Sequence, residues 1–300
     1  MLGTLRRVLV LLAAASLELH AQFSVEQHRA AASQLIQAAT RDSAGYNRLA
    51  RLVDGFGHRF SGSQSLERAL DWIVDEMKRD GLENVHKEPV MVTHWVRGGE
   101  SAELLSPRRT KLHMLGLGRS VGTPAGGIRA PVLVVRSFAD LRAHAAEARG
   151  KIVLYNVPFD TTVVPFEGYG RAVVYRGVGA DSASAVGAVA ALVRSVTPHS
   201  LQSPHAGSMQ PYDTTGRLRR IPAAAVSVED AEMMQRMQDR GQRIELLLSM
   251  SARTLAPARS YNVVGEIRGS DKPTRSWSWA GTSTRGTSDR VRWTTRPGAS

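Results

Sequence analysis

Residues 131–159 are PVLVVRSFADLRAHAAEARGKIVLYNVPF, and this stretch decides the fold class. Two short apolar runs, Val132–Val135 and Lys151–Tyr155, enclose a longer segment, Phe138–Ala148. Short apolar runs favour strands, and the longer middle segment favours a helix. A strand, a helix and a strand in succession predict a compact α/β unit, which we expect to begin near residue 129.

The same alternation continues toward the C-terminus. Residues 177–196 predict a helix of small residues that ends at Gly187, followed by a strand at Ala188–Val193. A long polar connection, residues 198–220, leads to a further strand at Ala223–Val226.

A helix and a strand then close this unit. Glu229 and Asp230 suit the first turn of the helix, and Gly241 marks its end. Its methionines lie at helical spacing, which favours core packing over a promiscuous binding surface. The strand has apolar residues at alternate positions, which predicts that one face is buried: Ile244, Leu246, Leu248 and Met250.

Before this unit, residues 26–56 predict two helices with a polar break at 42–45. A third helix has an apolar stripe that begins at Leu66 and is expected to stop at Gly81. Strands are predicted from Val85 and again at 94–96, and the Gly-rich residues 116–127 predict a linker. Residues 261–268 predict one more strand.

The N-terminus has the features of a secretory signal peptide. Arg6 and Arg7 precede an apolar run, Val8–Leu17, and small residues lead to a cleavage site near Ala21. This run is about half of the ~20 residues that a membrane-spanning helix needs, so we expect no membrane span. We expect a secreted or periplasmic protein whose stability, in the absence of cysteine, comes from its core.

The net charge of +12 suggests polyanionic partners, nucleic acid among them. The basic residues are scattered, however, and residues 271–300 contribute six Lys/Arg against two Asp. Since no nucleic-acid-binding motif accompanies the charge, we predict that nucleic acid is not a partner. Binding of other anionic polymers through the arginines remains an open alternative.

Familiar catalytic motifs are absent from the sequence. No nucleophile elbow or helical zinc motif occurs, and Gly116–Gly122 has the wrong spacing for dinucleotide binding. The histidines at 58, 86, 94 and 113 follow no ligand spacing, which favours surface or loop positions. We therefore assign no catalytic, no cofactor-binding and no metal-binding residue to this chain.

Longer strings carry a family resemblance that spans roughly residues 45–270. They include YNRLARLVD (46–54), RFSGS (59–63), DWIVDEMK (71–78), AAEARGKIV (145–153) and VEDAEMM (228–234). These strings resemble the carboxypeptidase Q-like group of the co-catalytic dizinc aminopeptidase/carboxypeptidase family. The resemblance implies an α/β fold: the N-terminal part of a mostly parallel-sheet peptidase domain, interrupted by an inserted protease-associated domain of the β-rich α+β kind.

The resemblance also implies domain boundaries. We expect a signal peptide at 1–21, the N-terminal part of the peptidase domain at 22–128, the inserted domain at 129–254, a return to the peptidase domain at 255–272, and an out-of-frame tail at 273–300. Family members bind two zinc ions through His, Asp and Glu, and these activate a water that attacks the peptide carbonyl. Peptide substrates and a homodimer are the partners that the resemblance implies.

The zinc ligands of the family follow the strand at 261–268, beginning with an H-x-D segment and continuing with paired aspartates. Residues 273–300 contain no His and no Glu. We therefore expect that no zinc binds this chain and that it is an inactive fragment of a metallocarboxypeptidase or dipeptidase. The alternative is a non-catalytic secreted protein that binds partners through the protease-associated module.

We hypothesise that the tail is the correct gene read one base out of phase. Trp has the single codon TGG and Thr codons begin with AC, so the triplet straddling Trp293 and Thr294 is GAC, which encodes Asp. The same logic forces Gly across Trp279 and Ala280. With G/C-rich third bases where the code leaves a choice, the shifted triplets from Thr274 encode DEVVVVGGHIDSWDVGQGAVDD, a strand followed by H-x-D and paired aspartates.

Overall fold

The computed structural model describes residues 28–199, 201–210, 220–268, 275–281 and 294–297. The chain divides into two compact units, Met1–Gly57 and His58–Ser300. In the first, residues 28–41 form a helix and α2 (Ala44–Phe56) follows a two-residue break, as the sequence predicted. The predicted signal peptide, 1–21, lies outside the described residues.

The second unit begins with helix α3 (Gln64–Arg79), which confirms the third predicted helix. Ser63 caps its N-terminus, where the side-chain oxygen accepts a hydrogen bond from the backbone N–H of Leu66. Gly81 follows its C-terminus with φ of +82°, a left-handed conformation that glycine adopts without steric cost. Leu66 and Leu70 are buried and pack with Val263.

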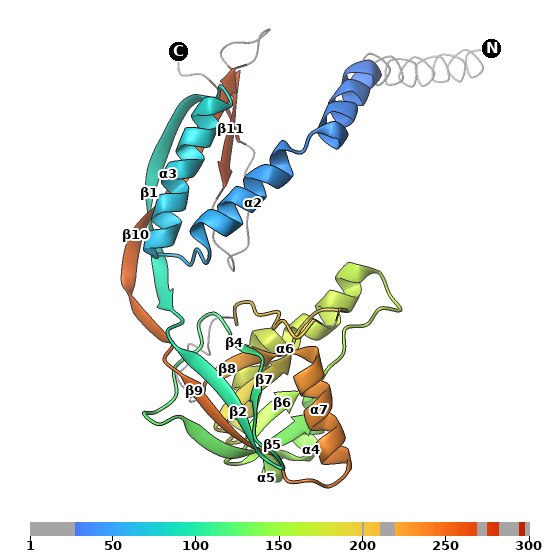
Figure 1. The fold of residues 1–300 in the computed structure, drawn as a ribbon. Helices are drawn as coiled ribbons and strands as arrows, with labels where there is room; N and C mark the ends of the chain where they lie inside the picture. The colour runs from blue at the N-terminus through green and yellow to red at the C-terminus, as the bar shows by residue number, and fades with distance from the viewer. Residues whose placement is uncertain (1–27, 200, 211–219, 269–274, 282–293, 298–300) are drawn as a thin grey trace, which may run out of the picture. The chain divides into compact units, whose positions relative to one another are not determined.

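A four-stranded sheet lies next to α3 in the order β1-β10-β11-β12 (Figure 1). Its strands are β1 (Glu83–Val96), β10 (Arg253–Arg268), β11 (Arg275–Gly281) and β12 (Thr294–Pro297). β1 is one continuous strand with a register shift between Val92 and His94, where the sequence predicted two strands.

The expectation of a mostly parallel sheet in this region is wrong for the described strands, because all three pairings are antiparallel. Only six residues, 269–274, connect β10 to β11. A parallel pairing needs a crossover of about a dozen residues or more, so this short connection allows only an antiparallel neighbour.

A separate eight-stranded mixed sheet has the order β3-β2-β9-β5-β6-β7-β8-β4. The pairs within β5-β6-β7-β8 are parallel, and the others are antiparallel. The strands are β2 (Glu100–Ser106), β3 (Thr110–Leu112), β4 (Met114–Gly116), β5 (Ile128–Val135), β6 (Ile152–Tyr155), β7 (Ala190–Arg194), β8 (Ala223–Val226) and β9 (Glu245–Met250).

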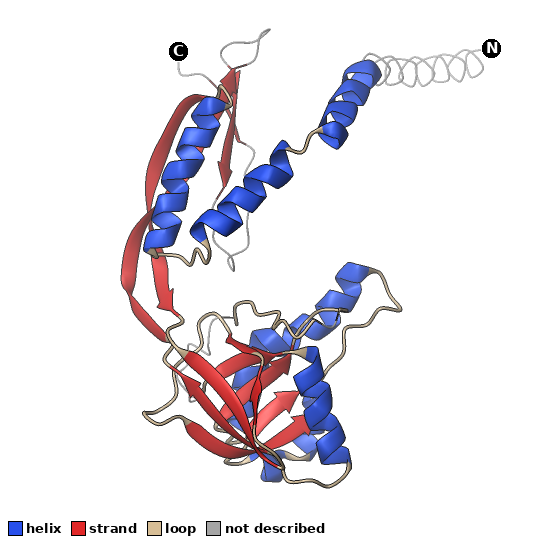
Figure 2. Ribbon diagram, viewed as in Figure 1, coloured by secondary structure: helices blue, strands red, loops and turns tan. Residues whose placement is uncertain are grey.

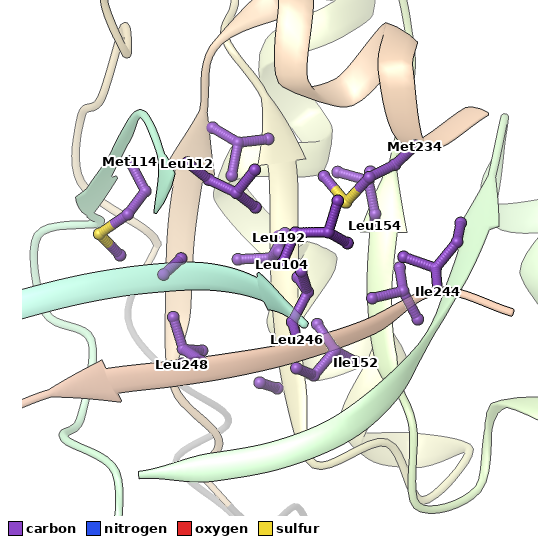
Figure 3. Packing of buried hydrophobic residues seen from close by; sticks show 14 of the residues in the cluster. Leu104, Leu112, Met114, Ile152, Leu154, Leu192, Met234, Ile244, Leu246 and Leu248 are labelled. Carbon is purple, nitrogen blue, oxygen red and sulfur yellow. The ribbon is translucent and has the colours of Figure 1, made fainter. Parts of the chain in front are cut away.

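Helices cover both faces of this sheet (Figure 2). On one face α7 (Val228–Asp239) buries Met234 against Val132, Val134 and Leu154. Figure 3 shows how the leucines of several strands converge on this cluster. The other face packs against α4 (Phe138–Ala143), α5 (Ala145–Ala148) and α6 (Pro165–Ala185).

The structure confirms most of the predicted elements of this sheet and corrects others. The helix predicted at 138–148 is interrupted at His144, and α6 begins twelve residues before the predicted start at 177. Gly116 lies in β4 rather than in a linker. Strands β3 and β4 have three residues each, too few to show a period of two in the sequence.

The buried positions of α7 confirm that its methionines pack in the core, since Met234 and Met237 are 0% and 5% exposed. No described helix combines the length and the apolar character that crossing a bilayer requires.

Candidate functional site

The four histidines noted in the sequence lie on different elements. His58 precedes α3, His86 and His94 lie on β1, and His113 lies between β3 and β4. The Nδ1 atom of His113 is 3.4 Å from the Asp230 carboxylate. Within the described ranges, no group of three or more His, Cys, Asp or Glu side chains is placed to bind a metal ion.

A polar cluster forms where three parallel strands end. Arg136 directly follows β5, Asn156 directly follows β6, and Arg194 is the last residue of β7. Because these strands are parallel and adjacent, their carboxyl ends meet at one edge of the sheet. Open α/β sheets bind ligands at this edge.

Helix α7 supplies the other half of the polar cluster. The Asn156 Nδ2 atom and the Arg136 Nε atom each lie 3.4 Å from the Gln235 Oε1 atom. Gln235 in turn donates to Asp239 at 2.9 Å. Arg194 donates to Asn156 Oδ1 at 3.2 Å and pairs with Glu232.

Burial distinguishes this polar cluster from a solvated surface network. Asn156 and Gln235 are 5% and 6% exposed, and the Arg194 side chain is 12% exposed. The Nε atom of Arg194 is buried and has no hydrogen-bond partner. Guanidinium and amide groups can bind a carboxylate or another anion, but they offer no nucleophile. The guanidinium and amide groups of the cluster therefore suit it to binding an anion.

These three residues were not predicted from the sequence to form a site. Arg136 and Asn156 directly follow apolar strands, as in Val134-Val135-Arg136 and Leu154-Tyr155-Asn156, and Arg194 ends one. A polar residue at the end of each buried strand is a signal that the sequence contains. Its meaning depends on the strand order, which the sequence did not predict.

A second buried polar group lies near the start of β2. The Glu100 carboxylate accepts a hydrogen bond from the backbone N–H of Gly116 at 3.0 Å, and its other oxygen is 3.8 Å from Arg97 Nη1. The Arg97 guanidinium lies over the rings of Phe60 and Trp95, 5.2 and 5.7 Å from their centroids.

Burial shifts the acid–base properties of both members of this pair. Loss of solvation raises the pKa of Glu100 above its usual value, although the Gly116 N–H, Arg97 and His58 act against the shift. Loss of solvation likewise lowers the pKa of Arg97, and Glu100 opposes this change. Through the hydrogen bond from Gly116, Glu100 links β2 to β4.

Comparison with known proteins shows extended similarity to carboxypeptidase Q. The chain is 49% identical to the Homo sapiens protein over 228 residues, which are 76% of this chain and 46% of that protein. It is 47% identical to the Xenopus laevis protein over 252 residues, 83% of this chain and 52% of that protein. This chain belongs to the carboxypeptidase Q family. No protein-family model matches the sequence.

Among solved structures, the carboxypeptidase Q-family fold seen here is similar to a peptidase M28 precursor from Shewanella amazonensis. The TM-score is 0.76 with 32% sequence identity, over 82% of this chain and 55% of that one. The similarity supports a mixed α/β fold of the peptidase M28 type. This chain spans about half the length of the carboxypeptidase Q relatives that it matches.

Proposed function

We propose that this chain is the N-terminal part of a secreted zinc metallocarboxypeptidase or dipeptidase, which hydrolyses short peptides with a metal-activated water. The observation that carries the proposal is the similarity to proteins named carboxypeptidase Q over 228 residues. The signal-peptide features of residues 1–21 support an extracytoplasmic location.

The strand connections support an inserted protease-associated module. The chain leaves the four-stranded sheet after Val96 and returns to it at Arg253, and the strands between these points form the other sheet. The insertion predicted at 129–254 would omit β2, β3 and β4, which belong to the same sheet as β5–β9. We therefore place the module at about residues 97–252.

The described residues do not fit a two-zinc site, because they supply no group of ligands that could hold even one ion. The tail at 273–300 lies mostly outside the described residues. We propose that the ligands are encoded there in the shifted frame, which restores an H-x-D segment and paired aspartates. No catalytic step can be assigned to the side chains that this chain places in space.

Two measurements test this proposal together. Resequencing the gene across the codons for residues 268–276 and beyond is expected to reveal a reading frame that continues into the H-x-D segment. The frame-restored protein is then expected to hydrolyse dipeptides and to lose this activity when a chelator removes its metal, whereas the chain as written has none. A frame-restored, folded protein without peptidase activity would refute the assignment.

A second candidate is a non-catalytic secreted protein that binds partners through the inserted module. The observation that favours it is the module's own two-sided core, which uses residues from 102 to 250 only. A fragment of residues 97–252 is expected to be soluble and monodisperse. The fragment 129–254 is expected to aggregate, because it lacks β2 beside β9 and β4 beside β8.

A further inference from the structure

The β5 strand has an edge that its neighbour covers only in part. β9 pairs with β5 over Ile128–Pro131, and the last contact is the hydrogen bond from Val132 N–H to the carbonyl of Ile244, at 3.0 Å. After this point β9 no longer follows β5, and the main-chain groups of Val134 face the position that a strand would occupy.

One side chain satisfies both of these main-chain groups. The Oε1 atom of Gln238, on α7, accepts from the Val134 N–H at 2.7 Å, and its Nε2 atom donates to the Val134 carbonyl at 2.8 Å. A carboxamide carries the same donor and acceptor pair as a peptide group. Gln238 therefore makes the two hydrogen bonds that a residue of a neighbouring strand would make.

A groove of about 660 Å³ runs along this edge. Its lining comes from both covering layers, with Asp140 and His144 from one face of the sheet and Gln238 and Asp239 from the other. The main chain of Pro131–Val134 lies between them. The groove therefore lies in the plane of the sheet, between the two layers of covering helices. Its volume is within the range of ligand sites.

We propose that this groove binds an extended peptide segment, which adds to β5 as a strand and displaces the Gln238 carboxamide. Main-chain hydrogen bonds at an exposed sheet edge are a general mode of peptide recognition. In this proposal the peptide runs antiparallel to β5, in the same direction as β9 on that side of the strand.

The walls of the groove favour a single chain over a second copy of the protein. α4 and α5 on one side and α7 on the other flank the edge, so a sheet with its own covering helices would collide with them. A short peptide needs only the width of one strand, about 4.8 Å in the hydrogen-bonding direction. This binding needs no metal and no hydrolysis.

The probe for the test is the blocked pentapeptide acetyl-Thr-Val-Thr-Val-Thr-amide, added to the full chain. Hydrogen exchange measured by mass spectrometry reports on the Val132–Arg136 segment. In the Gln238→Met variant the Val134 amide is expected to lose protection and to regain it when the peptide is added. Because the competing carboxamide is absent, the variant is also expected to bind the peptide about tenfold more tightly than the unmodified chain.

Two controls separate strand addition from other forms of binding. The same peptide with N-methyl groups on alternate amides keeps its side chains but lacks the donors, and is expected not to bind. Gln64→Met changes an exposed glutamine at the start of α3 and is expected to leave peptide affinity unchanged.

Three outcomes would overturn the proposal. The first is an absence of peptide-dependent protection in the Gln238→Met variant. The second is equal binding of the N-methylated peptide, which would mean that side chains alone are recognised. The third is protection that rises with protein concentration without peptide, which would mean that a second copy covers the edge.

Discussion

Glu100 and Arg97 form a largely buried charge pair whose hydrogen bonds are incomplete. The Glu100 side chain is 9% exposed and the Arg97 side chain 16%. One Glu100 oxygen and the Arg97 Nε atom have no hydrogen-bond partner. Removal of solvent therefore outweighs the attraction between the two groups, which explains why burial is the largest cause of both pKa shifts.

This imbalance predicts a pH-dependent effect of Arg97→Met. The pKa of Glu100 is raised in the folded chain, so folding favours the protonated acid, and stability falls as pH rises from about 4.5 through the raised pKa. Without Arg97 the charged carboxylate loses its counterion. Urea unfolding followed by Trp fluorescence is expected to show a loss of about 2 kcal/mol at pH 7 and less at pH 4.5.

The double variant Arg97→Met/Glu100→Gln serves as the control and is expected to recover much of this loss, because the uncompensated charge is gone. A destabilisation of the same size at both pH values would mean that lost packing on Phe60 and Trp95 is the cause instead.

At the scale of single elements, neighbouring residues of β9 differ in how deeply their side chains are buried, and therefore in how much each contributes to stability. Leu246 is fully buried in the core that faces α7, whereas Leu247 on the opposite side is only half-buried. The alternation predicted from Ile244, Leu246, Leu248 and Met250 is confirmed, because all four are buried. β9 lies between β2 and β5, so both of its edges have a strand neighbour.

Truncation of these two leucines is expected to separate burial from strand propensity. Leu246→Ala removes side-chain volume from a closed core and is expected to destabilise the chain by about 3 kcal/mol. Leu247→Ala makes the same chemical change at a half-buried position and is expected to cost about 1 kcal/mol. Denaturant midpoints of the two variants measure the difference, and equal midpoints would contradict the proposed packing.

At the scale of the whole molecule, part of the net positive charge comes from a segment that lies outside the family resemblance. Of the net charge of +12, residues 271–300 contribute +4, from six Lys/Arg and two Asp. The frameshift hypothesis attributes this part to triplets read out of phase, and not to selection for a partner. A protein whose function is to bind anionic polymers would instead bind them through basic residues outside the tail as well.

Deletion of residues 271–300 distinguishes these possibilities. If the tail is the main source of polyanion affinity, the deletion is expected to lower the salt concentration at which the protein elutes from heparin. A deletion of equal length, residues 28–57, is not a matched control, because it removes four Arg and two Asp and therefore a net charge of +2. Charge reversal of the tail arginines is the better control. Undiminished retention after both changes would favour a general basic surface.

Most helices and buried strands of this chain could be predicted because their signals are local. Ser63 and Gly81 lie at the ends of α3, and alternation along 244–250 predicts which face of β9 is buried. Strands β3 and β4 were missed because three residues carry no detectable period. The early start of α6 at Pro165 was also missed, since its apolar residues follow no single stripe: Phe166 is exposed and Gly168 is buried.

The sequence by itself determined the α/β class, the order of most elements, the family resemblance and the hypothesis of an out-of-phase tail, since these depend on residue patterns along the chain. Only the tertiary structure decided which strands are neighbours. It brought Arg136, Asn156 and Arg194 to one edge and placed Gln238 against Val134. Such sites combine residues that are distant in sequence, and strand order depends on packing between elements rather than on any local propensity.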